Sequence, residues 1–214
     1  MEKRIVPVGP IDANCIVLWP SAAQPTGGKV PCWLIDPGAD AEDLIAICEK
    51  AGLEPVLVAL THGHFDHIGA IPGLLARWPG LPIHISPGDA EWAFSRANAW
   101  VPYYEPVARP ASVVEDLVDG ATLAAGGLSA TVVATPGHTP GGVCLHIPSE
   151  RMLFTGDTLF AGSCGRTDFP GGSMSQLRVS LRRLAELPAE TVVTPGHGGE
   201  TTIGREIESN PYLV

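Results

Sequence analysis

The amino-acid sequence predicts an α/β (α+β) protein of a single domain, in which two sheets stack face to face and helices cover their outer surfaces. Its 214 residues, 45% of them apolar, are enough to bury one sizeable core. Strand-like and helix-like segments alternate in two successive blocks, which is the order expected of such a layered arrangement. Because no flexible linker or shift in composition divides the chain, we expect residues 1–214 to form one domain.

The first block begins with strands and contains one clear helix. Apolar and β-branched runs predict three strands, at residues 4–8, 15–19 and 31–36. Residues 41–51 carry apolar side chains at helical spacing and precede Gly52, a typical helix end. The continuous apolar run at residues 55–60 predicts a strand that is covered on both faces.

The middle of the chain continues this alternation and then loses it. The pattern predicts a helix that includes residues 74–78, a strand at residues 82–85 and a helix at residues 87–98. Residues 99–112 have no clear period and contain three prolines, which predicts a long loop. Loops of this length are often lids or binding loops.

The second block repeats the theme of the first. Short apolar runs predict strands at residues 122–123, 128–134, 143–147, 152–155 and 191–194. An amphipathic pattern predicts a helix at residues 173–187, and a shorter one predicts a final helix at residues 203–209. Strands followed by helices in both blocks favour two sheets with helices outside them.

Composition excludes several classes of partner and setting. The formal net charge of −10 argues against nucleic acid and against an anionic membrane, because both require a basic surface. The first residues lack the apolar stretch of an export signal, and no window approaches the ~18 apolar residues of a spanning helix. Five cysteines without a CxxC pair indicate reduced thiols, so we expect a cytoplasmic protein.

Five of the seven histidines share one local pattern. They come after predicted strands and, except for His67, stand next to glycine, which allows the sharp turns that aim a side chain off the strand end. Aspartates occupy the same kind of position. The set consists of His62, His64, Asp66, His67, His138, Asp157 and His197. His84 and His146 lie inside apolar strand patterns, so we interpret both as structural.

This set is typical of a site for two metal ions. His62 and His64, two residues apart in an extended segment, can point the same way, whereas Asp66 and His67 fall on the following turn and can face a second ion. Imidazole and carboxylate together suit zinc, iron or manganese. Six or seven such ligands are too many for one tetrahedral site but suit two ions that share a bridge.

The motifs that carry these residues resemble those of the metallo-β-lactamase superfamily. They are THGHFDH at residues 61–67, followed by TPGH, TGD and TPGH around His138, Asp157 and His197. The resemblance implies a four-layer αββα sandwich with the metals at one edge between the sheets. It also implies that His62, His64 and His138 hold the first metal, that Asp66, His67 and His197 hold the second, and that Asp157 bridges them.

Within that superfamily the chain looks most like short, single-domain relatives of glyoxalase II, the hydroxyacylglutathione hydrolases. This implies a hydrolase that cleaves a small-molecule thioester such as S-D-lactoylglutathione by metal-bound hydroxide, which Asp66 would orient. It also implies two divalent metal ions, zinc first, with iron or manganese as alternatives. The helical C-terminal region with which long-form relatives bind glutathione has no counterpart in this sequence. Arg166, in the CGR loop, is the remaining candidate for a glutathione contact, and Ser163 and Cys164 beside it are not expected to be catalytic.

Several alternatives stay open on the sequence. The CGRTDF segment also resembles persulfide dioxygenases, which hold one iron by two histidines and a carboxylate, here His62, His138 and Asp157. A lactamase and a non-catalytic metal-binding module are further alternatives. The residues leave the metal, the acyl group, the thiol carrier and the oligomeric state open.

Overall fold

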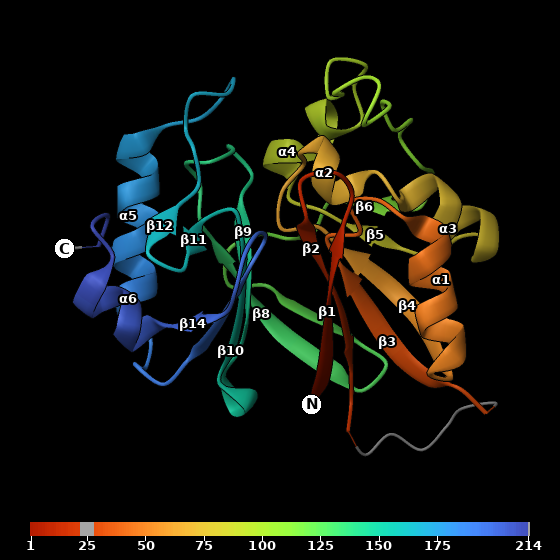
Figure 1. The fold of residues 1–214 in the computed structure, drawn as a ribbon, viewed down its shortest axis with the longest axis horizontal. Helices are drawn as coiled ribbons and strands as arrows, with labels where there is room; N and C mark the ends of the chain where they lie inside the picture. Colours follow the sequence, from red (N-terminus) through yellow and green to blue (C-terminus); the bar gives the residue numbers. More distant parts are fainter. Residues whose placement is uncertain (22–27, 214) are drawn as a thin grey trace.

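Two six-stranded sheets form the centre of the molecule (Figure 1). The computed structural model describes residues 1–21 and 28–213. The first sheet follows chain order, with antiparallel pairing from β1 to β3 and parallel pairing from β3 to β6. Its strands are β1 (Glu2–Val8), β2 (Ala13–Trp19), β3 (Val30–Ile35), β4 (Leu53–Ala59), β5 (Ile83–His84) and β6 (Val113–Val114).

The second sheet is also mixed and comes from the second half of the chain. Its spatial order is β14-β13-β10-β9-β8-β7, and β10 and β13 are parallel neighbours. The strands are β7 (Thr122–Ala125), β8 (Leu128–Ala134), β9 (Val143–Ile147), β10 (Met152–Gly156), β13 (Val192–Pro195) and β14 (Thr201–Thr202). A small hairpin of β11 (Leu159–Phe160) and β12 (Ser163–Cys164) stands apart from both sheets.

Helices cover the outer faces of the two sheets, so the four layers expected from the sequence are confirmed (Figure 1). On the first sheet lie α1 (Ala41–Lys50) and α3 (Ile71–Arg77); on the second lie α5 (Met174–Ala185) and α6 (Ile203–Ser209). The short elements α2 (Phe65–Ile68), α4 (Pro87–Ala93) and the 3₁₀ turn η1 (Pro148–Glu150) complete the set. None of the helices in the described ranges is long and apolar enough to cross a membrane.

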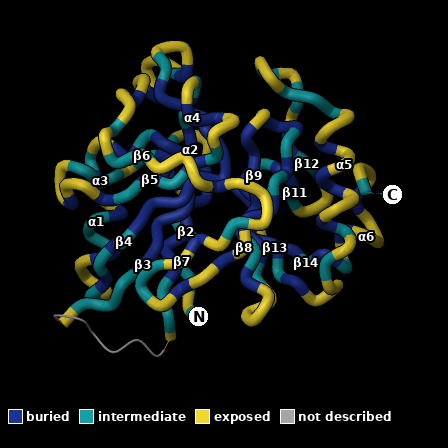
Figure 2. The backbone as a smooth tube through the Cα atoms, turned by 180° about the vertical axis from the view of Figure 1, so that it is seen from behind, coloured by how far each residue is buried: buried dark blue, intermediate teal, exposed yellow. Residues whose placement is uncertain are grey.

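Strand periodicity distributes the apolar side chains between an inner core and two outer ones. In β2, Ile16 and Leu18 face the second sheet, while Cys15 and Val17 face the helices α1 and α3. The same alternation in β3 and β4 explains why these strands appear as continuous apolar runs in the sequence: both of their faces are buried. Figure 2 shows the resulting buried centre with exposed turns around it.

The predicted elements are present, and the differences have local causes. The helix predicted at residues 87–98 ends at Ala93, because Asn98 Nδ2 donates to the Ala93 carbonyl and to the Gly63 carbonyl, both at 2.7 Å. The region from Phe65 to Arg77 forms two short helices, α2 and α3, with Gly69 and Ala70 between them. Strands β6, β11, β12 and β14 have two residues each and are too short to leave a periodic pattern.

Substitution of Leu145 tests the placement of the inner core between the two sheets. Its side chain is fully buried between the two sheets on the central strand β9, and its removal leaves a cavity there. We expect Leu145→Ala to lower the free energy of unfolding by about 2–5 kcal/mol. Val179→Ala, on the exposed face of α5 (59% exposed), should change it by less than about 0.5 kcal/mol. Equal effects of the two variants in urea unfolding would contradict this placement of the core.

Candidate metal centre

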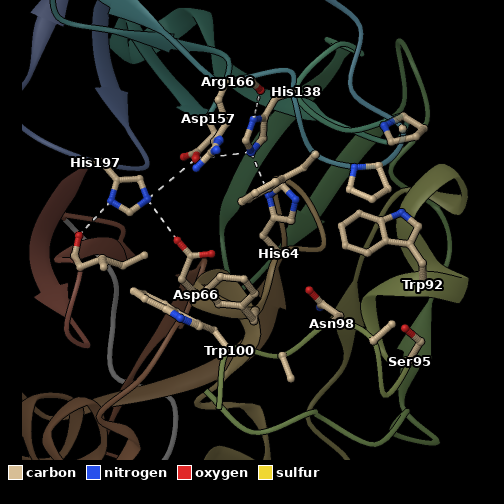
Figure 3. A pocket seen from close by; sticks show the side chains of 18 of the residues that line it. His64, Asp66, Trp92, Ser95, Asn98, Trp100, His138, Asp157, Arg166 and His197 are labelled. Carbon is tan, nitrogen blue, oxygen red and sulfur yellow. Dashed lines mark hydrogen bonds and ion pairs between the residues drawn. The ribbon is translucent and has the colours of Figure 1, made fainter. Parts of the chain in front are cut away.

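The seven histidines and aspartates singled out in the sequence come together at one edge of the two sheets. Figure 3 shows His64, Asp66, His138, Asp157 and His197 of this set. His62 and His64 follow β4, and the other ligand-type residues of the second half follow β8, β10 and β13. These three strands run in the same direction, so their carboxyl ends meet at the same edge. The fold therefore gathers side chains that lie up to 135 positions apart in the chain, from His62 to His197.

Three histidines form the first group. One ring nitrogen from each of His62, His64 and His138 lies within 4.8 Å of the others. His64 Nδ1 is 2.8 Å from His138 Nε2, and the ring of His62 stands edge-on to both neighbouring rings. All three residues are buried. Three imidazoles that converge in this way could hold one metal ion.

Asp66, His67 and His197 form the second group. Asp66 Oδ2 lies 3.2 Å from His197 Nε2 and 3.6 Å from His67 Nε2. Asp66 and His67 belong to α2, directly after His64, so the single turn of helix rotates them away from the first group and toward His197. Two imidazoles and a carboxylate at these distances make a second candidate metal site.

The carboxylate of Asp157 reaches both groups. Its Oδ2 is 3.5 Å from His138 Nε2 in the first group, and its Oδ1 is 3.5 Å from His67 Nε2 in the second. Gly156 precedes it with φ +46°, a left-handed conformation that favours glycine, and a Cβ at Gly156 would lie 2.1 Å from Thr61 Oγ1. The end of β10 can therefore approach the start of the histidine segment closely enough to place Asp157 between the groups.

Two glycines beside the histidines, Gly63 and Gly196, are required for lack of space around them rather than for unusual backbone angles. A Cβ on Gly196 would lie 2.3 Å from Asp157 Oδ1, and one on Gly63 would lie 2.7 Å from Ala93 Cβ. Neither glycine has a positive φ. The sharp-turn explanation suggested by the sequence is therefore wrong for Gly63 and Gly196, which are needed because other parts of the chain pack against them.

Backbone carbonyls orient two of the histidines through their second nitrogen. His138 Nδ1 lies 2.7 Å from the Arg166 carbonyl, and His197 Nδ1 lies 3.2 Å from the Ile11 carbonyl. A carbonyl oxygen can only accept, so each Nδ1 donates its hydrogen. The Nε2 atoms, which face the candidate ions, then carry free lone pairs, as metal binding requires.

The loop that carries His197 is attached to the start of the chain. Asn14 donates from its backbone to the Gly196 carbonyl at 2.7 Å and from Nδ2 to the carbonyls of Pro195 and Gly198, both at 2.9 Å. Ala13 pairs with His197 as an isolated β-bridge. The second group is therefore held between β2, near the start of the chain, and β13, near its end.

Asp36 orients His62 through Thr61. Its carboxylate accepts from the backbone N–H of Thr61 at 2.7 Å and from the Thr61 hydroxyl at 2.6 Å. Since that hydroxyl donates to Asp36, it accepts from His62 Nδ1, which lies 3.1 Å away. Asp36 also lies within ligand distance of His62 and His67, but these hydrogen bonds occupy its oxygens, so we assign it to positioning rather than to a metal.

Buried polar atoms without partners show that the site fits a metal. Among the described residues, six buried side-chain polar atoms have no hydrogen-bond partner. Trp78 Nε1 and the Tyr104 hydroxyl lie outside the two groups, and the other four are His62 Nε2, both ring nitrogens of His67 and Asp157 Oδ1. Leaving a buried polar group unpaired costs about 1–3 kcal/mol. His67 Nδ1 lies 3.1 Å from Asp36 Oδ2, so it faces that carboxylate rather than an ion. The other three atoms, His62 Nε2, His67 Nε2 and Asp157 Oδ1, belong to the candidate metal groups or to Asp157, and ions between the groups would account for their lone pairs.

Electrostatics differ between the two groups. Burial and the neighbouring imidazoles lower the pKa of His62 well below its usual value, and the same causes lower the pKa of His64 to about 3. Burial also acts to lower the pKa of His67, but the carboxylates of Asp66, Asp36 and Asp157 outweigh it and raise this pKa to about 10. Without metal, His62 and His64 are neutral at pH 7, whereas His67 holds a proton.

Sequence reasoning missed Asp89, a buried carboxylate that ties two ligand loops together. Its oxygens accept from the backbone N–H of Gly63 at 3.0 Å, of Gly141 at 2.6 Å and from the Thr139 hydroxyl at 2.7 Å. Gly63 lies between His62 and His64, and Thr139 follows His138. The sequence offered one signal for this residue: Asp89 lies three positions after Ser86, which caps α4. That pattern alone indicates only that a helix starts there.

A cavity of about 1140 Å³ opens in front of both groups. His64, Asp66, His138, Asp157 and His197 line one part of it (Figure 3). Ser163 and Cys164 also line it. Arg166 lines the cavity as well, but its guanidinium donates two 2.6 Å hydrogen bonds to Asp168. His84 and His146 belong to none of the candidate metal groups in the described chain; His84 lies 2.8 Å from Asp116.

Comparison with known families agrees with this geometry. The family model described as the metallo-β-lactamase superfamily matches residues 8–197. The chain belongs to the metallo-β-lactamase superfamily. It is 34% identical to the probable metallo-hydrolase YqgX of Bacillus subtilis and 33% identical to the hydroxyacylglutathione hydrolase GloC of Haemophilus influenzae. Both comparisons cover 100% of this chain and 98% of the relative, which makes this superfamily member a probable metal-dependent hydrolase.

Solved structures of the superfamily have the same architecture. The crystal structure of the BLEG-1 B3 metallo-β-lactamase superposes with a TM-score of 0.87 at 33% identity and covers 99% of each chain. That of TTHA1623, in a di-iron-bound form, superposes with a TM-score of 0.82 at 37% identity, over 98% of this chain and 100% of the other. The single-domain fold expected from the sequence is thereby confirmed.

Asp89 can be tested by replacing its carboxylate with an amide. In Asp89→Asn, an NH₂ group replaces one of the two oxygens that accept hydrogen bonds in the native protein, so a donor faces a donor. We therefore expect the free energy of unfolding to fall by about 1–3 kcal/mol. Metal retained after dialysis should fall too, because the loops of His62, His64 and His138 lose their common anchor. Glu91→Gln, on the exposed side of the same helix, is the matched control and should change neither. Unchanged metal retention in Asp89→Asn would contradict the anchoring role.

Metal binding should release protons at neutral pH. The raised pKa of His67, about 10, means that its imidazole is protonated at pH 7.5 in the metal-free protein, and an ion in the second group must displace that proton. We expect release of about one proton or more, and weaker metal binding as the pH falls. Calorimetric titration of metal into the metal-free protein, in buffers of different ionisation enthalpy, measures this. Absence of proton release would show that His67 is neutral before the metal binds.

Proposed function

We propose that this protein is a thioester hydrolase with two metal ions, one held by His62, His64 and His138 and the other by Asp66, His67 and His197. The observation that carries the proposal is the position of Asp157, whose two oxygens lie 3.5 Å from a nitrogen of each group. A carboxylate shared in this way supports a bridging role. It also supports a pair of ions close enough to act on one substrate group.

When bound, the ions would supply Lewis-acid polarisation of the substrate carbonyl and a water of lowered pKa. The chain's own residues orient the reactants. Asp66 faces the cavity, and although burial acts to raise its pKa, His67 and His197 lower it to about 2, so it stays ionised at neutral pH. It would therefore accept a hydrogen bond from the attacking water and orient it. A thiolate leaving group needs no strong proton donor, because thiols have a pKa near 8.5.

Glutathione thioesters are the first substrates to examine. Support comes from the relative GloC, described as a hydroxyacylglutathione hydrolase, and from the glyoxalase II-like motifs around the metal groups. We propose zinc as the resident metal, with iron as the alternative that the di-iron form of TTHA1623 supports. A reducing, cytoplasmic setting agrees with five free cysteines, four of them buried.

Metal analysis and a thioester assay test this proposal together. We expect about two ions per chain by elemental analysis and release of free thiol from S-D-lactoylglutathione. Asp157→Ala should lose metal and reduce kcat/KM by at least about 100-fold, the loss that follows removal of a group important to a metal site. His84→Ala, which removes a histidine outside both groups, should keep its metal and its activity. Full metal and activity in Asp157→Ala would remove the bridging assignment.

The same samples distinguish the persulfide dioxygenase alternative. That activity would need a single iron and would consume oxygen with glutathione persulfide, which an oxygen electrode detects. One iron per chain and oxygen uptake, without cleavage of any thioester, would overturn the hydrolase proposal. A fully metallated protein with neither activity would favour a non-catalytic metal-binding module.

A further inference from the structure

Aromatic side chains form one wall of the cavity in front of the metal groups. We call Phe65, Trp92, Trp100 and Phe169 the aromatic wall; all four line the cavity. The rings of Trp92 and Phe169 stand edge-on to His64 with centroids 5.3 and 5.5 Å from it. The wall therefore begins in direct contact with a residue of the first metal group. A bound substrate whose carbonyl is at the metals must place one of its groups against it.

The wall draws on four separate parts of the chain, and Phe169 comes from the segment between β12 and α5. Phe65 lies in α2 between the two metal groups, Trp92 lies in α4, and Trp100 lies in the loop at residues 99–112. Trp100 is 44% exposed and is 6.1 Å from the ring of Phe65. An exposed tryptophan at the mouth of an apolar cavity leaves surface that a ligand can cover. Figure 3 shows Trp92 and Trp100 among the side chains that surround the cavity.

Charge in the cavity does not match a ligand rich in carboxylates. Of the described residues that line it, Arg166 is the one lysine or arginine. Its guanidinium is engaged in two directions: it pairs with both oxygens of Asp168, and it stacks 4.0 Å above the ring of Phe169. The glutathione half of a thioester carries two carboxylates, each of which needs a donor or cation when it leaves water.

From these observations we infer that the preferred thioester carries an uncharged group of aromatic-ring size, which packs on the aromatic wall. This inference rests on the proposed thioester hydrolysis and specifies its substrate class. A phenyl group in place of methyl offers several more carbons to the wall, and each methylene that an apolar pocket accepts can change kcat/KM by about tenfold. Binding of the ring covers Trp100 and Phe169 and adds no unpaired charge to the cavity.

Matched thioesters test the inference by turnover. S-lactoylglutathione and S-mandeloylglutathione share the thiol and differ in a methyl against a phenyl on the acyl side. The lactoyl thioesters of glutathione and of phenylmethanethiol share the acyl group and differ in the carrier. We expect kcat/KM to be at least about tenfold higher for the phenyl-bearing member of one pair or both. Equal values within both pairs, or a preference for S-lactoylglutathione in both, would overturn the inference while leaving the hydrolase proposal intact.

Binding without turnover separates the inference from the proposed function. The thioethers S-benzylglutathione and S-methylglutathione cannot be hydrolysed, and quenching of tryptophan fluorescence reports their binding to the metal-loaded protein. We expect the benzyl compound to bind at least about tenfold more tightly. Tight, selective binding with no cleavage of any thioester would refute the hydrolase and retain the ring site. Equal affinity together with equal turnover would refute the ring site.

Substitution of Trp100 tests whether the aromatic wall selects the ring-bearing substrate. Because its side chain is partly exposed, Trp100→Ala should fold normally, and we expect it to reduce the ratio of kcat/KM between phenyl and methyl substrates by about tenfold. Tyr212→Ala is the matched control, since Tyr212 is a 43% exposed aromatic residue that does not line the cavity, and it should leave the ratio unchanged. An unchanged ratio in Trp100→Ala, with the fold intact by circular dichroism, would remove Trp100 from the site.

Discussion

The candidate site depends on two buried carboxylates that fix the backbone from Thr61 to His64. Asp36 accepts from the amide and the hydroxyl of Thr61, and Asp89 accepts from the amide of Gly63. Buried carboxylates are costly unless donors surround them, and here those donors are the groups that aim His62 and His64. Because Asp36 follows β3 and Asp89 lies in α4, the segment is held from both sides. The positions of the histidines are thus a property of the packed fold rather than of the HGH motif alone.

The two candidate metal groups differ in the charge that their buried histidines carry when no metal is bound. His62 and His64 are buried among other imidazoles, and their low pKa values make them neutral donors that need no counterion. His67 instead lies among three carboxylates, which attract a proton when no metal is present. A divalent ion replaces that proton and satisfies the same carboxylates. The second group is consequently arranged for a cation whether or not the metal is bound.

Sequence patterns predicted the parts of this molecule that depend on periodicity and on residue type. The two-sheet architecture followed from buried runs such as residues 55–60, and all seven ligand-type residues followed from their place after strands. Contacts between distant segments left no such signal. Asp89 resembles an ordinary helix-start residue, and only the fold shows that it reaches Gly63, 26 positions away. The end of α4 was missed for the same reason, because it depends on Asn98 reaching back to Ala93 and Gly63.

The attachment of the His197 loop to Asn14 has a consequence for how the protein is made. During synthesis the segment from His62 to His67 leaves the ribosome long before β13. Until β13 pairs with β10 and meets β2, the second group lacks His197. Such distant pairings form slowly because a long loop must close first. Occupancy of both candidate metal sites would thus require that β13 has packed against β2. A chain arrested before residue 192 would present histidines to the cell's metals without the geometry to hold a pair of ions.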